Sequence, residues 1–157
     1  MDIASILVLF AFLGACFLAA ATGALFTPGV WYEALAKPDW RPPNWLFGPV
    51  WTALYIAIGV SGWLVWREAG FAGASVALLV YAVQLVLNAS WTVIFFGLHR
   101  PDLAFFEILA LWLAIVLSIV LFWPINVLAA LLLVPYALWV GFAAVLNYAI
   151  WRLNPAG

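Results

Sequence analysis

Amide and aromatic side chains recur along one stretch of the chain at spacings of three and four residues. They are Tyr81, Gln84, Asn88, Trp91 and Phe95. Side chains at these spacings share one face of a helix. Amides form hydrogen bonds and indole rings stack against flat molecules, so this face could line a binding site. Alternatively, Gln84 and Asn88 hydrogen-bond neighbouring helices, an interaction worth about 0.6 kcal/mol on average in membranes.

Two further stretches carry a tryptophan with polar or small companions on the same helical face. Trp51 precedes Tyr55 by four residues, and Trp139 is followed at four-residue intervals by Ala143 and Asn147. A small residue between an indole and an amide would leave room for a flat ligand. Ordinary core packing is the alternative interpretation.

The sequence contains eleven tryptophans, and nine of them fall into two groups. One group lies near the ends of apolar stretches, where tryptophan commonly anchors a protein at the membrane interface. Its members are Trp31, Trp40, Trp45, Trp66, Trp123 and Trp151. Trp51, Trp91 and Trp139 lie deeper, and these three carry the hypothesis of a ligand site.

The chemistry open to the chain is limited by the residues it lacks. Cys16, His99 and Lys37 are each the one residue of their type. An intramolecular disulfide, a thiolate metal cluster and a haem held by two of its own histidines are therefore excluded. No nucleotide-binding or hydrolase motif occurs. We expect no metal site, no required cofactor and no conventional catalytic residue, and the net charge of −1 excludes nucleic acid as a partner.

Glu107 is the one acid well within an apolar stretch, about one turn after Pro101 and Asp102. It could act in a proton relay. The favoured interpretation is that its side chain reaches the membrane interface, helped by the positive helix N-terminus.

The composition identifies the elements that hold these residues. Of the 157 residues, 70% are hydrophobic and 7% are charged, which does not provide a solvated surface. Apolar stretches of about 20 residues cross a bilayer as helices. The sequence predicts one all-α integral membrane domain, 1–157, a bundle of five transmembrane helices. The approximate spans are 3–26, 45–66, 74–98, 103–123 and 127–151.

The loop 27–44 joins the first two spans and is rich in proline, which restricts its backbone. It also holds tryptophans and the cations Lys37 and Arg41. A structured lid over a cavity and an anchor on the membrane surface both fit. In a lid, Lys37 or Arg41 could pair with ligand carboxylates, and solvated cations are the alternative.

The orientation in the membrane follows from the cations outside the spans. Lys37, Arg41, Arg100 and Arg152 fall on one side of a five-helix bundle and Arg67 on the other. Because cytoplasmic loops are enriched in Lys and Arg, the first loop and the C-terminus are predicted to be cytoplasmic and the N-terminus outside.

The sequence resembles the translocator protein family, also called TspO/MBR, tryptophan-rich sensory protein or peripheral-type benzodiazepine receptor. The most specific motif is the run Lys37-Pro38-Asp39-Trp40-Arg41-Pro42-Pro43-Asn44-Trp45, followed by Gly48-Pro49-Val50-Trp51. Further matching residues are Trp31-Tyr32, Thr52 to Tyr55, Gln84 to Asn88, Trp91, Phe95 to Gly97, Pro135-Tyr136, Trp139, Leu146 to Tyr148 and Trp151 to Asn154. The resemblance covers nearly the whole chain in the right order. One departure is Thr92-Val93, where relatives often carry a proline.

The resemblance implies a homodimer that binds porphyrins and other tetrapyrroles, cholesterol and benzodiazepine-type drugs in a pocket beneath the first loop. The lining that it implies consists of Tyr32, Trp51, Asn88, Trp91, Trp139, Ala143 and Asn147. It also implies sterol contact at Leu146, Tyr148 and Arg152, which fit the loose pattern proposed for cholesterol.

Three functions are compatible with the resemblance. The favoured one is a membrane receptor or sensor with a regulatory role. The alternatives are a transporter of porphyrins and an enzyme that degrades porphyrin in light, for which the resemblance implicates Trp51 and Trp139.

Overall fold

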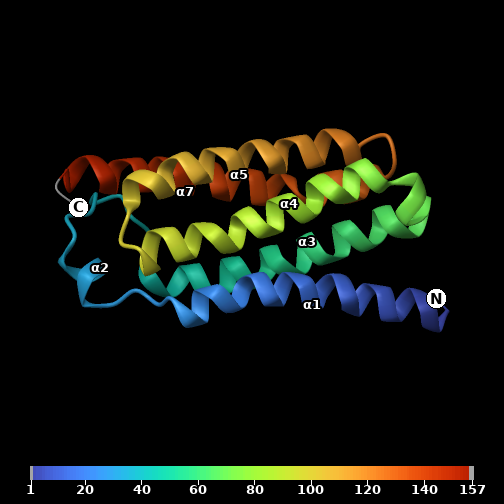
Figure 1. The fold of residues 1–157 in the computed structure, drawn as a ribbon, viewed down its shortest axis with the longest axis horizontal. Helices are drawn as coiled ribbons and strands as arrows, with labels where there is room; N and C mark the ends of the chain where they lie inside the picture. The colour runs from blue at the N-terminus through green and yellow to red at the C-terminus, as the bar shows by residue number, and fades with distance from the viewer. Residues whose placement is uncertain (1, 156–157) are drawn as a thin grey trace.

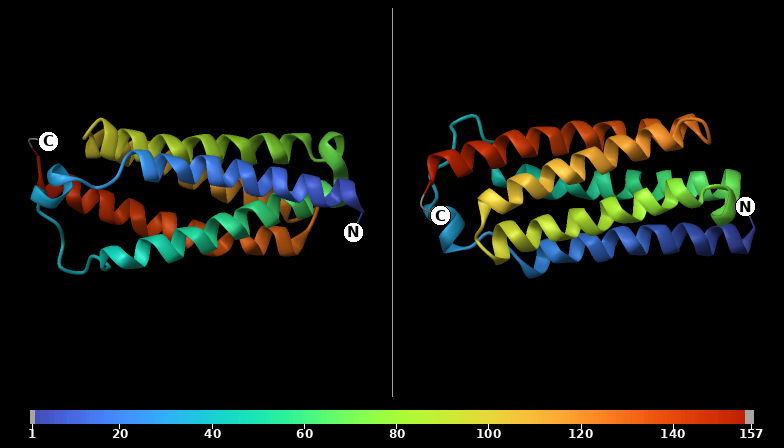
Figure 2. Two further views of the ribbon diagram at one scale, coloured as in Figure 1. Left: turned by 90° about the horizontal axis from the view of Figure 1, so that it is seen from below. Right: turned by 45° about the horizontal axis from the view of Figure 1, so that its top comes forward.

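A computed structural model of the chain describes residues 2–155 and shows long helices lying alongside one another (Figures 1 and 2). The elements are α1 (Ile3–Leu25), α2 (Val30–Ala34), α3 (Asn44–Gly73), α4 (Ser75–Thr92), the π-helical turn η1 (Val93–Gly97), α5 (Pro101–Phe122), α6 (Val127–Leu132) and α7 (Val134–Leu153). Among the described residues, five helical segments are long and apolar enough to cross a membrane. The predicted all-α five-helix membrane fold is confirmed.

The outer surface of the bundle is apolar along its length. Phe10 and Leu18 of α1 are 65% and 76% exposed, and Leu113 of α5 is 62% exposed. A surface of this kind is stable where lipid rather than water surrounds it. The exposed faces therefore support the bilayer as the environment of the protein.

The second predicted span ends too early. Arg67 and Glu68 were expected to lie in a polar break, but α3 continues to Gly73. The guanidinium of Arg67 lies 4.6 Å from the ring centre of Trp63, one turn earlier. Arg67 and Glu68 are both exposed, so the helix continues past them without burying a charge. The break occurs at Gly70, whose φ of 66° lies in the left-handed region that glycine adopts without strain.

The long helices form a ring in which α3 and α7 are the adjacent pair that packs most loosely. α1 packs against α3 and α4, α4 against α5, and α5 against α7. On its other side, α3 packs against the short α6 and only lightly against α7. Space between α3 and α7 is therefore available at the other end of the bundle, where the first loop lies.

The two termini lie at opposite ends of the bundle (Figure 1). The C-terminus and α2 of the first loop share one end, and His99 of the third loop stacks on Trp31 there, with ring centres 4.3 Å apart. This end holds the predicted cytoplasmic cations, and the membrane orientation itself stays a prediction.

Small residues of α3 allow close packing against α1. A Cβ atom added at Gly62 would lie 2.7 Å from Cδ1 of Phe12 and 2.8 Å from Cζ of Tyr81. Tyr81 cannot easily yield, because its hydroxyl donates to the carbonyl oxygen of Ile58 at 3.0 Å. Helices in lipid associate through such small residues, which let backbones approach.

The variant Gly62→Ala should lower the free energy of unfolding by about 1–3 kcal/mol, because overpacking forces aromatic rings to shift. Thermal unfolding in detergent micelles measures the effect. Gly14→Ala is the matched control on α1, since nothing lies within 4 Å of its added Cβ, and it should leave the stability equal or slightly higher. Equal stability of Gly62→Ala and the parent protein would contradict the packing described.

Candidate functional site

A cavity of about 690 Å³ lies beneath the first loop, between α1, α3, α4, α5 and α7. All residues predicted to line the pocket do line it: Tyr32, Trp51, Asn88, Trp91, Trp139, Ala143 and Asn147. Side chains outside the lining that the resemblance implies also contribute, among them Phe17, Glu33, Phe47, Tyr55, Phe95 and Leu146. The volume is in the range of pockets that hold drug-sized ligands.

The cavity walls are aromatic, and their rings are held by one another. Trp51 lies against Tyr55 with ring centres 5.4 Å apart, and Trp91 stacks on Phe95 at 5.0 Å. Phe47 meets Trp139 edge-on at 5.6 Å. Interlocked rings keep their faces in place before a ligand arrives, which reduces the entropy lost on binding.

Buried hydroxyls and amides form a chain of hydrogen bonds behind these walls. Tyr55 donates to Oδ1 of Asn88 at 2.6 Å, and Nδ2 of Asn88 donates to the hydroxyl of Tyr136 at 2.8 Å. Tyr136 in turn donates to Oε1 of Gln84 at 2.9 Å. The interpretation that Gln84 and Asn88 bond neighbouring helices is therefore confirmed, and Asn88 lines the cavity as well.

Asn147 joins three helices near the loop end of the cavity. Nε1 of Trp91 donates to its Oδ1 at 2.9 Å, and its Nδ2 donates to the carbonyl oxygen of Pro101 at 2.7 Å. Thr92 and Val93, which stand where relatives often carry proline, are the last residue of α4 and the first residue of the π-helical turn η1. The helix thus departs from α-geometry at this point without a proline, and Phe95 of that turn reaches the cavity.

The first loop is a structured lid, as one of its two interpretations predicted. The side-chain amide of Asn154 accepts from the backbone N–H of Ala36 at 3.0 Å and donates to its carbonyl oxygen at 2.9 Å, which fastens the loop to the end of α7. Tyr32 is buried and meets Phe96 edge-on, with ring centres 5.4 Å apart. The lid is therefore tied to the helices on both sides of the cavity.

The two cations of the lid are engaged within the loop. Nζ of Lys37 donates to the carbonyl oxygens of Glu33 at 3.1 Å and Leu35 at 2.9 Å, and burial lowers the pKa of this ammonium. Arg41 donates to Oδ1 of Asn44 at 2.7 Å. Neither cation lines the cavity, so the hypothesis that they meet ligand carboxylates is not supported by their positions.

The three residues of the predicted sterol segment face different surroundings. Leu146 is buried and lines the cavity. Tyr148 is 44% exposed and packs against Phe105, and Arg152 is exposed. The segment therefore does not form one wall, and sterol contact at Tyr148 and Arg152 stays a prediction for the outer surface.

The side chain of Glu107 does not lie where the sequence predicted. Both of its carboxyl oxygens are buried, and neither has a hydrogen-bond partner among the described residues. The side chain therefore turns into the protein, and the prediction that it reaches the interface is wrong. α5 packs against both α4 and α7, contacts that the sequence alone does not show.

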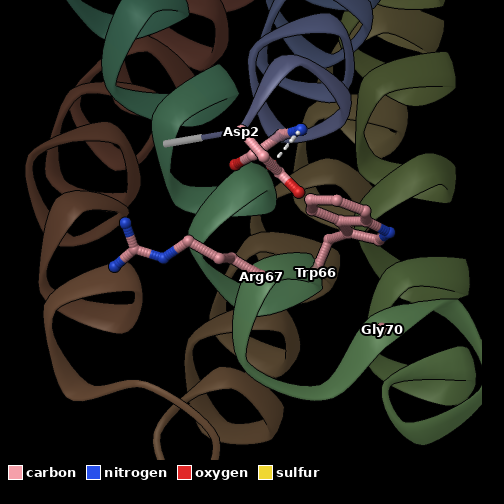
Figure 3. A pocket seen from close by; sticks show the side chains of 5 residues that line it. Asp2, Trp66, Arg67 and Gly70 are labelled. Carbon is pink, nitrogen blue, oxygen red and sulfur yellow. Dashed lines mark hydrogen bonds between the residues drawn. The ribbon is translucent and has the colours of Figure 1, made fainter.

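A second hollow, of about 590 Å³, lies at the opposite end of the bundle (Figure 3). It is lined by Asp2, Ser5, Trp66, Arg67 and Gly70. The carboxylate of Asp2 accepts from the backbone N–H of Ser5 at 2.9 Å and so caps α1, while the side chain of Arg67 points away from it. This hollow lacks the stacked rings of the first cavity.

The fold and the cavity define a multi-pass α-helical membrane protein with an aromatic cavity beneath a structured loop. The TspO/MBR family model matches residues 10–152, and the chain belongs to this family. It is 46% identical over 145 residues to "Protein CrtK" of Rhodobacter capsulatus, which covers 90% of this chain and 89% of the relative.

Two other relatives show how widely the similarity extends. The chain is 40% identical over 150 residues to "Tryptophan-rich protein TspO" of Chlorobaculum tepidum, covering 91% of this chain and 93% of the relative. It is 43% identical over 126 residues to the human "Translocator protein", covering 79% of this chain and 75% of the relative.

The variant Asn88→Ala should destabilise the protein by about 1–2 kcal/mol, because it leaves the buried hydroxyl of Tyr55 without its acceptor. Thermal unfolding in detergent measures this loss. The control is Ser90→Ala on the same helix, whose hydroxyl bonds only to the carbonyl oxygen of Val86, one turn earlier. If both variants unfold at the same temperature as the parent, the hydrogen bonds of Asn88 do not stabilise the packing of the helices.

Proposed function

We propose that this protein is a membrane receptor or sensor that binds tetrapyrroles, sterols or similar apolar molecules in the cavity beneath the first loop. The observation that carries the proposal is the convergence of Trp51, Trp91 and Trp139, from three different helices, on one cavity. The names of the relatives support a translocator or sensory role in a membrane, and the ligand class is the finer step proposed here.

We infer that a flat ring binds between Trp51 and Trp139. Trp51 and Trp139 stand on α3 and α7, the two helices that pack only lightly against each other. A ring between them would cover the faces of both indoles. Nε1 of Trp139 is buried and has no hydrogen-bond partner among the described residues, so Trp139 meets the cavity through its ring rather than through this donor.

The lid forms part of both the cavity wall and the protein surface, so ligand binding in the cavity can change that surface. Tyr32 lines the cavity, and the loop that carries it is fastened to α7 through Asn154. A ligand that moves Tyr32 would shift the surface of the lid, which a partner or a second copy of the chain could recognise. Binding with a regulatory role is therefore favoured over transport or degradation.

Replacing Trp51 and Trp139 together by phenylalanine should weaken the binding of protoporphyrin about tenfold, since each indole supplies a large stacking surface worth roughly 0.5–1.5 kcal/mol. The shift of the porphyrin absorption band and the quenching of tryptophan fluorescence give the dissociation constant. The matched control replaces Trp45 and Trp123, which are 71% and 51% exposed, in the same way. Equal affinity of both double variants would refute the assignment of the site.

The same preparation distinguishes the three functions. A sensor binds saturably and releases the ligand unchanged. Accumulation of porphyrin inside sealed vesicles would instead identify a transporter. Defined products formed under light, beyond one equivalent per protein, would identify a degrading enzyme.

A further inference from the structure

The cavity opens sideways between α1 and α3. Residues that both line it and are exposed mark this mouth: Phe17, Gly23, Pro28, Glu33, Asn44, Gly48 and Thr52. Nothing lies within 4 Å of a Cβ atom added at Gly23 or Gly48, so the edges of the mouth are open. Glu33 and Asn44 lie at its loop end, whereas Phe17 and Thr52 lie deeper along the helices. A ligand with one polar end would place that end beside Glu33.

Glu33 is the one charged side chain among the described residues that line the cavity. The other lining side chains are apolar, aromatic or small, or carry neutral amide or hydroxyl groups. Glu33 is exposed and forms no ion pair within the described part of the chain. Its carboxylate is therefore free to interact with a ligand at the mouth.

The nearby cations leave this negative charge in place. Lys37 is held by two backbone carbonyl oxygens and lies 4.7 Å from the ring centre of Tyr32. Its pKa responds to the Glu33 charge, but the two groups form no ion pair. Arg100 is occupied by Asp102, to which it donates two hydrogen bonds. Among these charged groups, the carboxylate of Glu33 is therefore the one whose residue lines the cavity.

We propose that Glu33 selects the charge of the ligand's polar end, an inference that rests on the proposed function of the cavity. An ammonium or hydroxyl group at that end donates a hydrogen bond to the carboxylate. A carboxylate at that end meets a like charge instead. The cavity therefore favours flat or elongated apolar ligands that end in an ammonium or a hydroxyl over ligands that end in free carboxylates.

Three derivatives of one porphyrin that differ only in the charge of their terminal groups test this selection. The probes are protoporphyrin as the free diacid, as its dimethyl ester, and as a diamide that carries two ammonium groups. The protein is kept in neutral detergent at low ionic strength. We expect the parent protein to bind the diamide most tightly and the diacid most weakly.

The variant Glu33→Gln should bind the diacid about threefold more tightly and the diamide about threefold more weakly, with the ester unchanged, as expected for charges near a solvated surface. Glu33→Lys should reverse the order of the diacid and the diamide. Salt near 0.5 M should reduce these differences by screening. The control Glu68→Gln makes the same change of net charge beside Arg67, away from the cavity, and should shift no affinity.

The outcomes separate the two proposals. If no form of the ring binds saturably, the proposed function fails. If all forms bind but Glu33→Gln shifts none of them, or shifts the ester as much as the diacid, the selection by Glu33 is overturned while the proposed function stands.

Discussion

The hydrogen-bonded chain of Tyr55, Asn88, Tyr136 and Gln84 is the constraint on which the rest of the structure depends. Lipid supplies no hydrophobic force that drives one apolar helix against another, so the need to satisfy buried polar groups fixes how each helix is rotated. These hydrogen bonds join α3, α4 and α7. Each deep tryptophan lies one turn from a member of the chain: Trp51 from Tyr55, Trp91 from Asn88 and Trp139 from Tyr136. The bonds that orient the helices therefore also direct the three indoles into one cavity.

The two ends of the cavity differ in character because different interactions build them. Deep in the bundle, stacked rings and satisfied amides make rigid, neutral walls. At the loop end, proline-restricted backbone and the hydrogen bonds of Asn154 hold a lid in which Lys37 donates to backbone carbonyl oxygens and Arg41 to the side chain of Asn44. The result is an apolar space with an acidic edge, which suits a ligand that has a flat apolar body and a donor at one end.

Much of the fold and of the site follows from the sequence, because both depend on local patterns. Apolar stretches of membrane length fix the helices, and the spacing of Asn88 and Trp91 places them on one face. The partner of a polar side chain is not local: Tyr136 lies far along the chain from Gln84, so only the three-dimensional structure pairs them. For the same reason, spacing could not show that Glu107 turns inward, that Lys37 bonds its own loop, or that Glu33 reaches the cavity.

The most direct test of the central claim is a crystal structure with a zinc-containing porphyrin ester bound, in which the anomalous scattering of zinc marks the ligand. We expect one strong peak between Trp51 and Trp139, beneath the lid that carries Tyr32. A peak on the lipid-facing surface, with the space between the two indoles free of the ring, would contradict it.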